Sequence, residues 1–196
     1  MLLPLICALF HLINFLSMKK TVWTFGLISG TIVSIALLAG IVLRTGPDGK
    51  VDMEGGTILG YTSMIVALSL IFFGIRSYRD NHLGGSISFG KALKIGLLIT
   101  SVASIMYVTT WMVYYHTTDT EQFGKQYTEH LTESMRADGA TAEEIKDAME
   151  KNQGFMKLYD SNPAFMFVVT LMEIFPVGLV ISLISSYFLR AKAVRE

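Results

Sequence analysis

The residue best suited to chemistry is Glu173, a carboxylate inside a long apolar run. It stands three residues before Pro176 in the stretch TLMEIFPVG, residues 170–178. It lies nine residues into an expected membrane helix, roughly 13 Å deep at about 1.5 Å per residue. Because an ionised carboxylate is costly at that depth, we expect Glu173 to be protonated, to face water or to meet a polar partner.

Two interpretations of Glu173 stay open. Pro176 removes a backbone hydrogen bond and frees the carbonyl of Met172. Glu173 is then either a proton or cation site at this helix kink, or a neutral group that joins two helices by a hydrogen bond. The expected spans contain no second acid or base, which leaves a proton relay incomplete within one chain. The candidate hydroxyl partners of a neutral acid are Thr100, Ser101, Ser104, Ser63 and Ser34.

A second segment, GSISFGKA at residues 85–92, nearly matches a phosphate-binding loop. That loop needs a preceding strand and a final hydroxyl, whereas here a membrane helix precedes the segment and Ala92 ends it. We read it as a turn at Gly84–Gly85 followed by a helix that Ser86 or Ser88 caps. The segment therefore predicts local structure and no nucleotide site.

The surrounding loop is a candidate cytoplasmic interface. Lys91 is expected to keep its charge at the membrane surface while its aliphatic stem lies along apolar groups. Arg79 and Asp80 are adjacent, which is most simply a local ion pair or a contact with lipid headgroups.

The remaining reactive residue types predict no active or metal site. Cys7 is the single cysteine, so it forms no disulfide within the chain. His116 and His130 stand among acidic residues but lack the close spacing of two zinc ligands. No Ser/His, Cys/His or paired-acid arrangement is evident, and we expect no enzyme activity, no metal and no cofactor.

The composition indicates which elements must position these residues. Of 196 residues, 52% are hydrophobic and only 16% are charged, and the mean hydropathy is +0.49. These values are typical of a membrane protein, for which the lipid bilayer is the first partner. No basic patch with interleaved aromatic residues is present, so nucleic acid binding is not expected.

Four apolar segments, 22–43, 57–75, 95–115 and 164–189, are long enough to cross a bilayer core of about 30 Å. Lysine and arginine gather before the first segment, between the second and third, and after the fourth. By the positive-inside rule we expect both termini to lie in the cytoplasm. The expected location is the inner (plasma) membrane. Tyr107 and Trp111 are read as part of an aromatic belt at the outer end of the third span.

Residues 1–17 are apolar and uncharged but lack a basic start and a small-x-small cleavage site, which argues against a signal peptide. We expect Met18 to be the native start and residues 1–17 to be a mis-called extension; the alternative is a fifth, short membrane segment. Mass spectrometry of the native N-terminus tests this, because any peptide containing Cys7 refutes it.

Small residues recur every four positions on each span, which favours close helix packing either within one chain or between chains. Residues 116–162, between the third and fourth spans, predict an outward-facing amphipathic helical hairpin. Gly139 is its expected turn, Thr141 and Glu144 form a capping-box pattern, and Gly154 is the expected end of the second helix.

Three stretches carry a resemblance to a known family: YRDNHLGGSISFGKALKIG at 78–96, Tyr159 with the Asn162–Pro163 approach, and EIFPVGLVISLIS at 173–185. They resemble a family of small bacterial integral membrane proteins catalogued as domain of unknown function 4199. The resemblance covers roughly residues 18–190. It implies four spans and a start just before the first, and it assigns no activity.

The sequence thus predicts an all-α membrane bundle of four helices, with an extramembrane hairpin between the third and fourth, and a tail after residue 189. The expected function is that of a non-enzymatic binding or regulatory membrane component with a membrane-protein partner or as a homo-oligomer. The alternative is a small proton- or cation-coupled carrier that uses Glu173.

Overall fold

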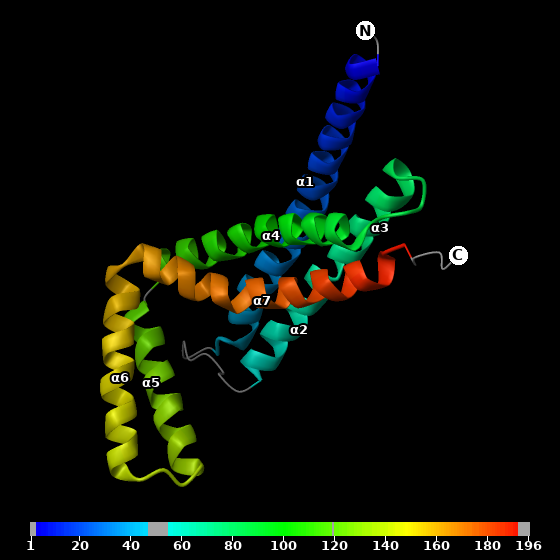
Figure 1. The fold of residues 1–196 in the computed structure, drawn as a ribbon. Coiled ribbons are helices and arrows are strands. Elements are labelled where there is room, and N and C mark those ends of the chain that lie inside the picture. Colours follow the sequence, from blue (N-terminus) through cyan, green and yellow to red (C-terminus); the bar gives the residue numbers. More distant parts are fainter. Residues whose placement is uncertain (1–2, 47–54, 119, 192–196) are drawn as a thin grey trace.

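The computed structural model describes residues 3–46, 55–118 and 120–191, and the side chains within these ranges except those of residues 3–15 and 120–123. The described residues are helical almost throughout (Figure 1). The helices, in chain order, are α1 (Leu3–Arg44), α2 (Gly56–Leu68), α3 (Leu70–His82), α4 (Phe89–Thr117), α5 (Thr120–Ala137), α6 (Ala142–Ser161) and α7 (Pro163–Leu189).

Four segments of the described chain are long and apolar enough to cross a membrane: Leu16–Arg44, Gly56–His82, Phe89–Thr117 and Pro163–Leu189. Their number equals the number of spans expected from the sequence, and the chain is a membrane protein. The second span consists of α2 and α3, which meet at Ser69, where the side chain donates to the carbonyl of Val66 at 2.6 Å. The first three spans are longer than predicted because polar end residues continue the helix beyond the apolar core, whereas the fourth gains only Pro163.

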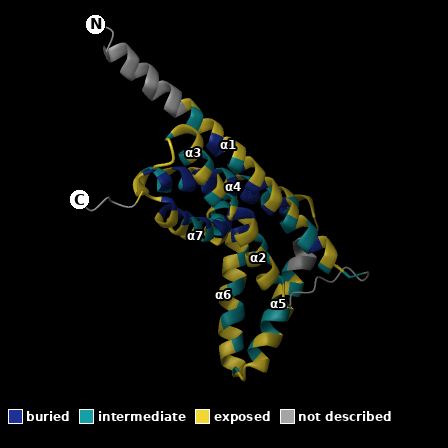
Figure 2. Cartoon of the chain, turned by 90° about the vertical axis from the view of Figure 1, so that its right-hand side faces the viewer, coloured by how far each residue is buried: buried dark blue, intermediate teal, exposed yellow. Residues whose placement is uncertain are grey.

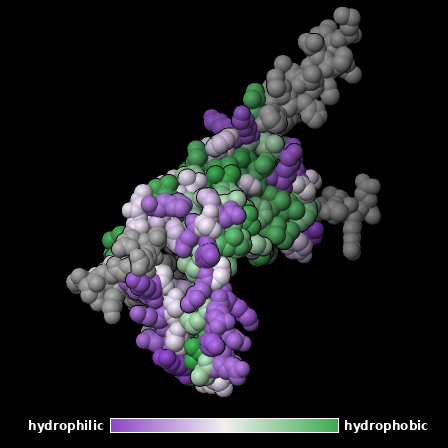
Figure 3. All heavy atoms as spheres, turned by 90° about the vertical axis from the view of Figure 1, so that its left-hand side faces the viewer, coloured by the Kyte–Doolittle hydropathy of each residue, from purple (hydrophilic) through white to green (hydrophobic). Residues whose placement is uncertain are grey.

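The surface of the bundle is apolar, as lipid requires. Leu43 is 82% exposed and Ile58 is 75% exposed. Figure 3 shows hydrophobic residues over much of the bundle, whereas the α5–α6 hairpin is largely hydrophilic. A soluble protein would have to bury such a surface, so its exposure agrees with insertion into a bilayer.

Helix α4 is the centre of the bundle, and its neighbours approach it through small residues. A Cβ on Gly30 of α1 would lie 3.0 Å from Cβ of Met106, and one on Gly96 of α4 would lie 2.8 Å from Oγ of Ser182 on α7. Figure 2 shows buried residues along these helices, while α5 and α6 are mostly exposed or half-buried. The small-residue stripes of the first, third and fourth spans therefore pack within one chain.

The second span behaves differently. Gly60 of α2 has no neighbouring atom within 4 Å of a Cβ built on it. The small-residue stripe of the second span therefore makes no close contact at Gly60 within this chain, and its packing between chains stays a prediction. The space left behind is part of a cavity.

The hairpin consists of α5 and α6, which lie side by side and project from the bundle (Figure 1). Gly139 turns the chain at φ +83°, and Thr141 forms the predicted capping box with Glu144. The expected helix end at Gly154 is wrong, since α6 continues to Ser161. Tyr159, in the last turns, is buried against Tyr115 and Met166, and this packing outweighs the low helix propensity of one glycine.

Two predicted boundaries concern the starts of α1 and α4. Helix α1 runs without a break from Leu3, so residues 3–17 continue the first helix. That Met18 is the native start stays a prediction. Ser88 does stand at the N-cap of α4, but no side-chain hydrogen bond caps the helix there.

Candidate functional site: a carboxylate-lined cavity between the helices

A cavity of about 500 Å³ lies among α1, α2, α4 and α7. It follows α1 from Val33 to Arg44, a length of roughly 16 Å at about 1.5 Å per residue. Its residues are mainly apolar, with a few polar groups. They are Val33, Ala36, Leu37, Gly40, Ile41, Arg44, Gly56, Thr57, Leu59, Gly60, Ser63, Met64, Tyr107, Trp111, Tyr127 and Glu173.

Glu173 projects from the middle of α7 into the wall of this cavity. Neighbouring helices surround it, yet the residue is exposed, because the space in front of its carboxylate is the cavity and not packed protein. The side chain of Tyr107 on α4 lies near this carboxylate and lines the same cavity. The acid thus has a polar neighbour and open space in front of it.

The position of Tyr107 beside Glu173 was not predicted, because Tyr107 was interpreted as an aromatic residue at the membrane interface. The sequence carried a usable signal: Tyr107 continues the stripe of Gly96, Thr100 and Ala103, at spacings of three and four residues. Residues so spaced share one face of a helix. All four are buried, and the stripe faces α7 at Gly96 and Thr100.

The hydroxyls proposed as partners of Glu173 have other roles. Thr100 bonds to the carbonyl of Gly96 at 3.0 Å and lies 3.2 Å from Oγ of Ser182. Ser34 accepts from Thr110 at 3.1 Å, and Ser101 donates to the carbonyl of Leu97 at 2.8 Å.

The two remaining serines of this set, Ser104 and Ser63, differ in their surroundings. Ser104 is buried, and its hydroxyl has no hydrogen-bond partner among the described residues. Ser63 lines the cavity with Glu173 while donating to the carbonyl of Gly60 at 2.7 Å. Of the five candidates only Ser63 therefore shares a space with the acid.

Pro176 lies outside the cavity. It is an exposed residue, and α7 continues through it from Pro163 to Leu189. The four residues predicted as one intramembrane site, Glu173, Pro176, Thr100 and Ser104, are therefore not brought together around a single space.

The opposite end of the cavity contains Arg44, the last residue of α1. Its Nε donates to the carbonyl of Gly40 at 2.9 Å, within the same helix. The guanidinium occupies the space in which a side chain at Gly56 would stand. Arg44 thus contributes a positive group at the rim, three turns of α1 away from Val33.

An aromatic cluster fixes the wall of the cavity on its α4 side. The indole Nε1 of Trp111 donates to the hydroxyl of Tyr159 at 2.7 Å, and this hydroxyl lies 3.1 Å from Oγ1 of Thr170. Tyr115, one turn further along α4, donates to the carboxylate of Asp160. These bonds join α4, α6 and α7, so the hairpin is anchored beside the cavity.

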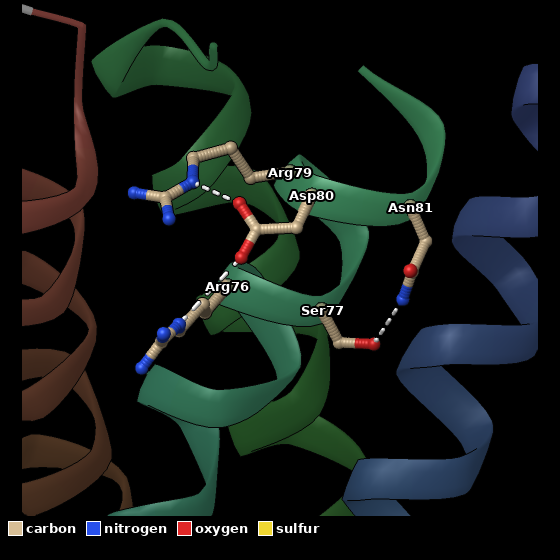
Figure 4. A network of polar contacts seen from close by, with 5 residues as sticks. All are labelled: Arg76, Ser77, Arg79, Asp80 and Asn81. Carbon is tan, nitrogen blue, oxygen red and sulfur yellow. Dashed lines mark hydrogen bonds and ion pairs between the residues drawn. The ribbon is translucent and has the colours of Figure 1, made fainter. Parts of the chain in front are cut away.

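The candidate cytoplasmic interface is only partly assembled. Nε of Arg79 lies 2.7 Å from the Asp80 carboxylate, which confirms the predicted local ion pair, and Arg76 adds a second contact at 3.6 Å (Figure 4). Lys91 instead lies 5.5 Å from the ring centre of Tyr78. Exposed pairs of this kind contribute little to stability.

A second space of about 640 Å³ separates α5 and α6, and its lining is predominantly charged and polar, including Lys125, Glu129, Glu133 and Arg136. Charges of both signs alternate there, so it shows no preference for one class of ligand. Within the described residues no group of three or more His, Cys, Asp or Glu side chains could hold a metal ion, and His116 and His130 form no such site.

Comparison with known proteins gives one finding. No curated protein and no solved structure matches the chain significantly. A family model described as "Protein of unknown function (DUF4199)" matches residues 24–191, which is most of the chain. This confirms the resemblance seen in the sequence, and the protein belongs to the DUF4199 family of proteins of unknown function.

Proposed function

We propose that the protein is a non-enzymatic binding component of the plasma membrane, and that its ligand site is the cavity at Glu173. The observation that carries this proposal is a carboxylate at mid-helix that lies near Tyr107 and opens to a cavity of about 500 Å³. Binding sites are typically such concave, mostly apolar spaces with a few convergent polar groups. An intramembrane acid that served only to join helices would have no need of open space.

The distribution of charge supports an orientation for this site. Nine lysines and arginines stand before the first span, between the second and third, and in the tail, which favours the cytoplasm for these segments. The α5–α6 hairpin then lies outside the membrane on the other face. The cavity extends towards that face, because Arg44, Gly56 and Tyr127 of α5 line it.

A second candidate function is a small proton- or cation-coupled carrier. The access of Glu173 to the cavity favours it, since transport requires an acid that exchanges its cation or proton with solvent. Four helices enclose little space, so a carrier of this size would work as an oligomer. Flux of protons or cations into vesicles containing the purified protein distinguishes a carrier from a binding component.

Carbodiimide labelling in native membranes tests the shared premise of both functions. The reagent enters lipid and modifies protonated carboxyl groups, and mass spectrometry of the α7 peptide reads the product. We expect modification of Glu173 that declines as the pH rises, and none in Glu173→Gln. Failure to label Glu173 at any pH would show a closed, packed acid and would overturn the proposed site.

A further inference from the structure

We infer that the cavity binds a lipophilic organic cation, with its positive centre beside Glu173 and its apolar body along α1 and α2. This inference deepens the proposed function and rests on it. It names the ligand class from four properties of the cavity: its volume, its apolar walls, the placement of its charges and the aromatic rings near the acid.

The volume and the walls suit an organic molecule. About 500 Å³ lies within the range of roughly 300–1,000 Å³ that drug-sized ligands occupy. Val33, Leu37, Leu59 and Met64 supply apolar surface along its length. Such walls give a hydrated inorganic ion no compensation for its lost water, whereas an apolar body gains by leaving water.

The charges indicate a cation at the deep end. Among the described residues that line the cavity, Glu173 is the one acid and Arg44 the one base. Thr110 bonds to Ser34 at 3.1 Å, which places the neighbouring turn of α4, with Tyr107, beside Val33. Because Arg44 lies about 16 Å further along α1, the space next to the carboxylate is negative when Glu173 is ionised.

The aromatic rings add a second attraction for a positive centre. Tyr107 and Trp111 are four residues apart and so lie on one face of α4, and both line the cavity. Trp111 is held in place by its bond to Tyr159. A cation against the face of a tryptophan or tyrosine ring gains about 0.5–2 kcal/mol. One carboxylate and a phenol are too few oxygen ligands for calcium or magnesium, which take about six or more.

Binding of radiolabelled tetraphenylphosphonium to the full-length protein, purified in detergent, tests the inference. Tetraphenylborate is the matched control, because it has nearly the same shape and the opposite charge. We expect saturable binding of tetraphenylphosphonium that unlabelled tetraphenylphosphonium displaces and tetraphenylborate does not. Glu173→Gln should weaken binding at least tenfold, and Glu129→Gln, in the exposed hairpin, should leave it unchanged.

A second variant makes the test independent of the acid. Gly60→Leu adds a side chain where the structure has open space, so the fold should tolerate it while the cavity becomes smaller. We expect it to abolish tetraphenylphosphonium binding without lowering the melting temperature.

Three outcomes overturn the inference: no saturable binding, equal binding of the two ions, or binding that survives both Glu173→Gln and Gly60→Leu. If Glu173 still reacts with carbodiimide in that case, the proposed site stands and only the ligand class is wrong. If it does not react, the proposed function fails as well.

Discussion

Replacement of Gly178 by alanine tests the packing of α4 against α7, which positions Glu173 one and a half turns away. A Cβ at this position would overlap Cγ2 of Thr100 and lie 2.8 Å from its Oγ1 and 3.1 Å from its Cβ. Thr100 cannot rotate away freely, because its hydroxyl bonds to the carbonyl of Gly96 and lies close to Oγ of Ser182. The helices must therefore move apart.

The cost follows from overpacking. Extra methyl groups in a filled interior destabilise proteins by about 1–3 kcal/mol, and for a chain of this length each kcal/mol lowers the melting temperature by roughly 2–4 °C. Gly154→Ala is the matched control, since that glycine is also helical, is exposed and has open space around it. It should stabilise the protein by about 0.5–1 kcal/mol, because alanine favours the helix.

The assay is thermal unfolding of the purified variants in one detergent, followed by the loss of helical circular dichroism. In a Thr100→Ala background two of the three clashing atoms are absent, so Gly178→Ala should cost less by about 1 kcal/mol, a coupling typical of residues in contact. Equal melting temperatures for Gly178→Ala and Gly154→Ala would refute this helix interface, and a cost unaffected by Thr100→Ala would refute the assigned contact.

Three further predictions concern single bonds. Tyr159→Phe removes the acceptor of the half-buried Trp111 indole, and loss of this hydrogen bond should destabilise the protein by about 0.5–1.5 kcal/mol, measured by the same unfolding assay. The pKa of Glu144 lies below its usual value because the backbone and hydroxyl of Thr141 donate to its carboxylate. The stability that Glu144 gives to the start of α6 is therefore present above about pH 4.5 and is lost as the pH falls below it. Amide exchange at the start of α6 should accelerate at low pH in the wild type but change less in Thr141→Ala. Asp80→Asn should leave the melting temperature unchanged, since its ion pairs are exposed; a clear decrease would contradict that assignment.

Much of the fold could be predicted because membrane insertion imposes strong local rules. A helix must be about 20 apolar residues long to cross the bilayer, so four spans are visible in the composition alone. The same holds for the hairpin turn at Gly139 and the capping box at Thr141, which depend on neighbouring residues. The end of α6 was predicted wrongly because the burial of Tyr159 by residues of other helices decides it.

The sequence by itself determined that Glu173 lies within a membrane helix and needs a partner or open space, because an unpaired charge is costly in the apolar core. Only the tertiary structure decided that Tyr107 lies near the acid, that Thr100 bonds within the α4–α7 interface, and that a cavity lies in front of the acid. The reason is geometric. Which faces of two helices meet depends on the rotation and separation of both, and the open space beside Gly60 depends on where α2 lies against the other helices.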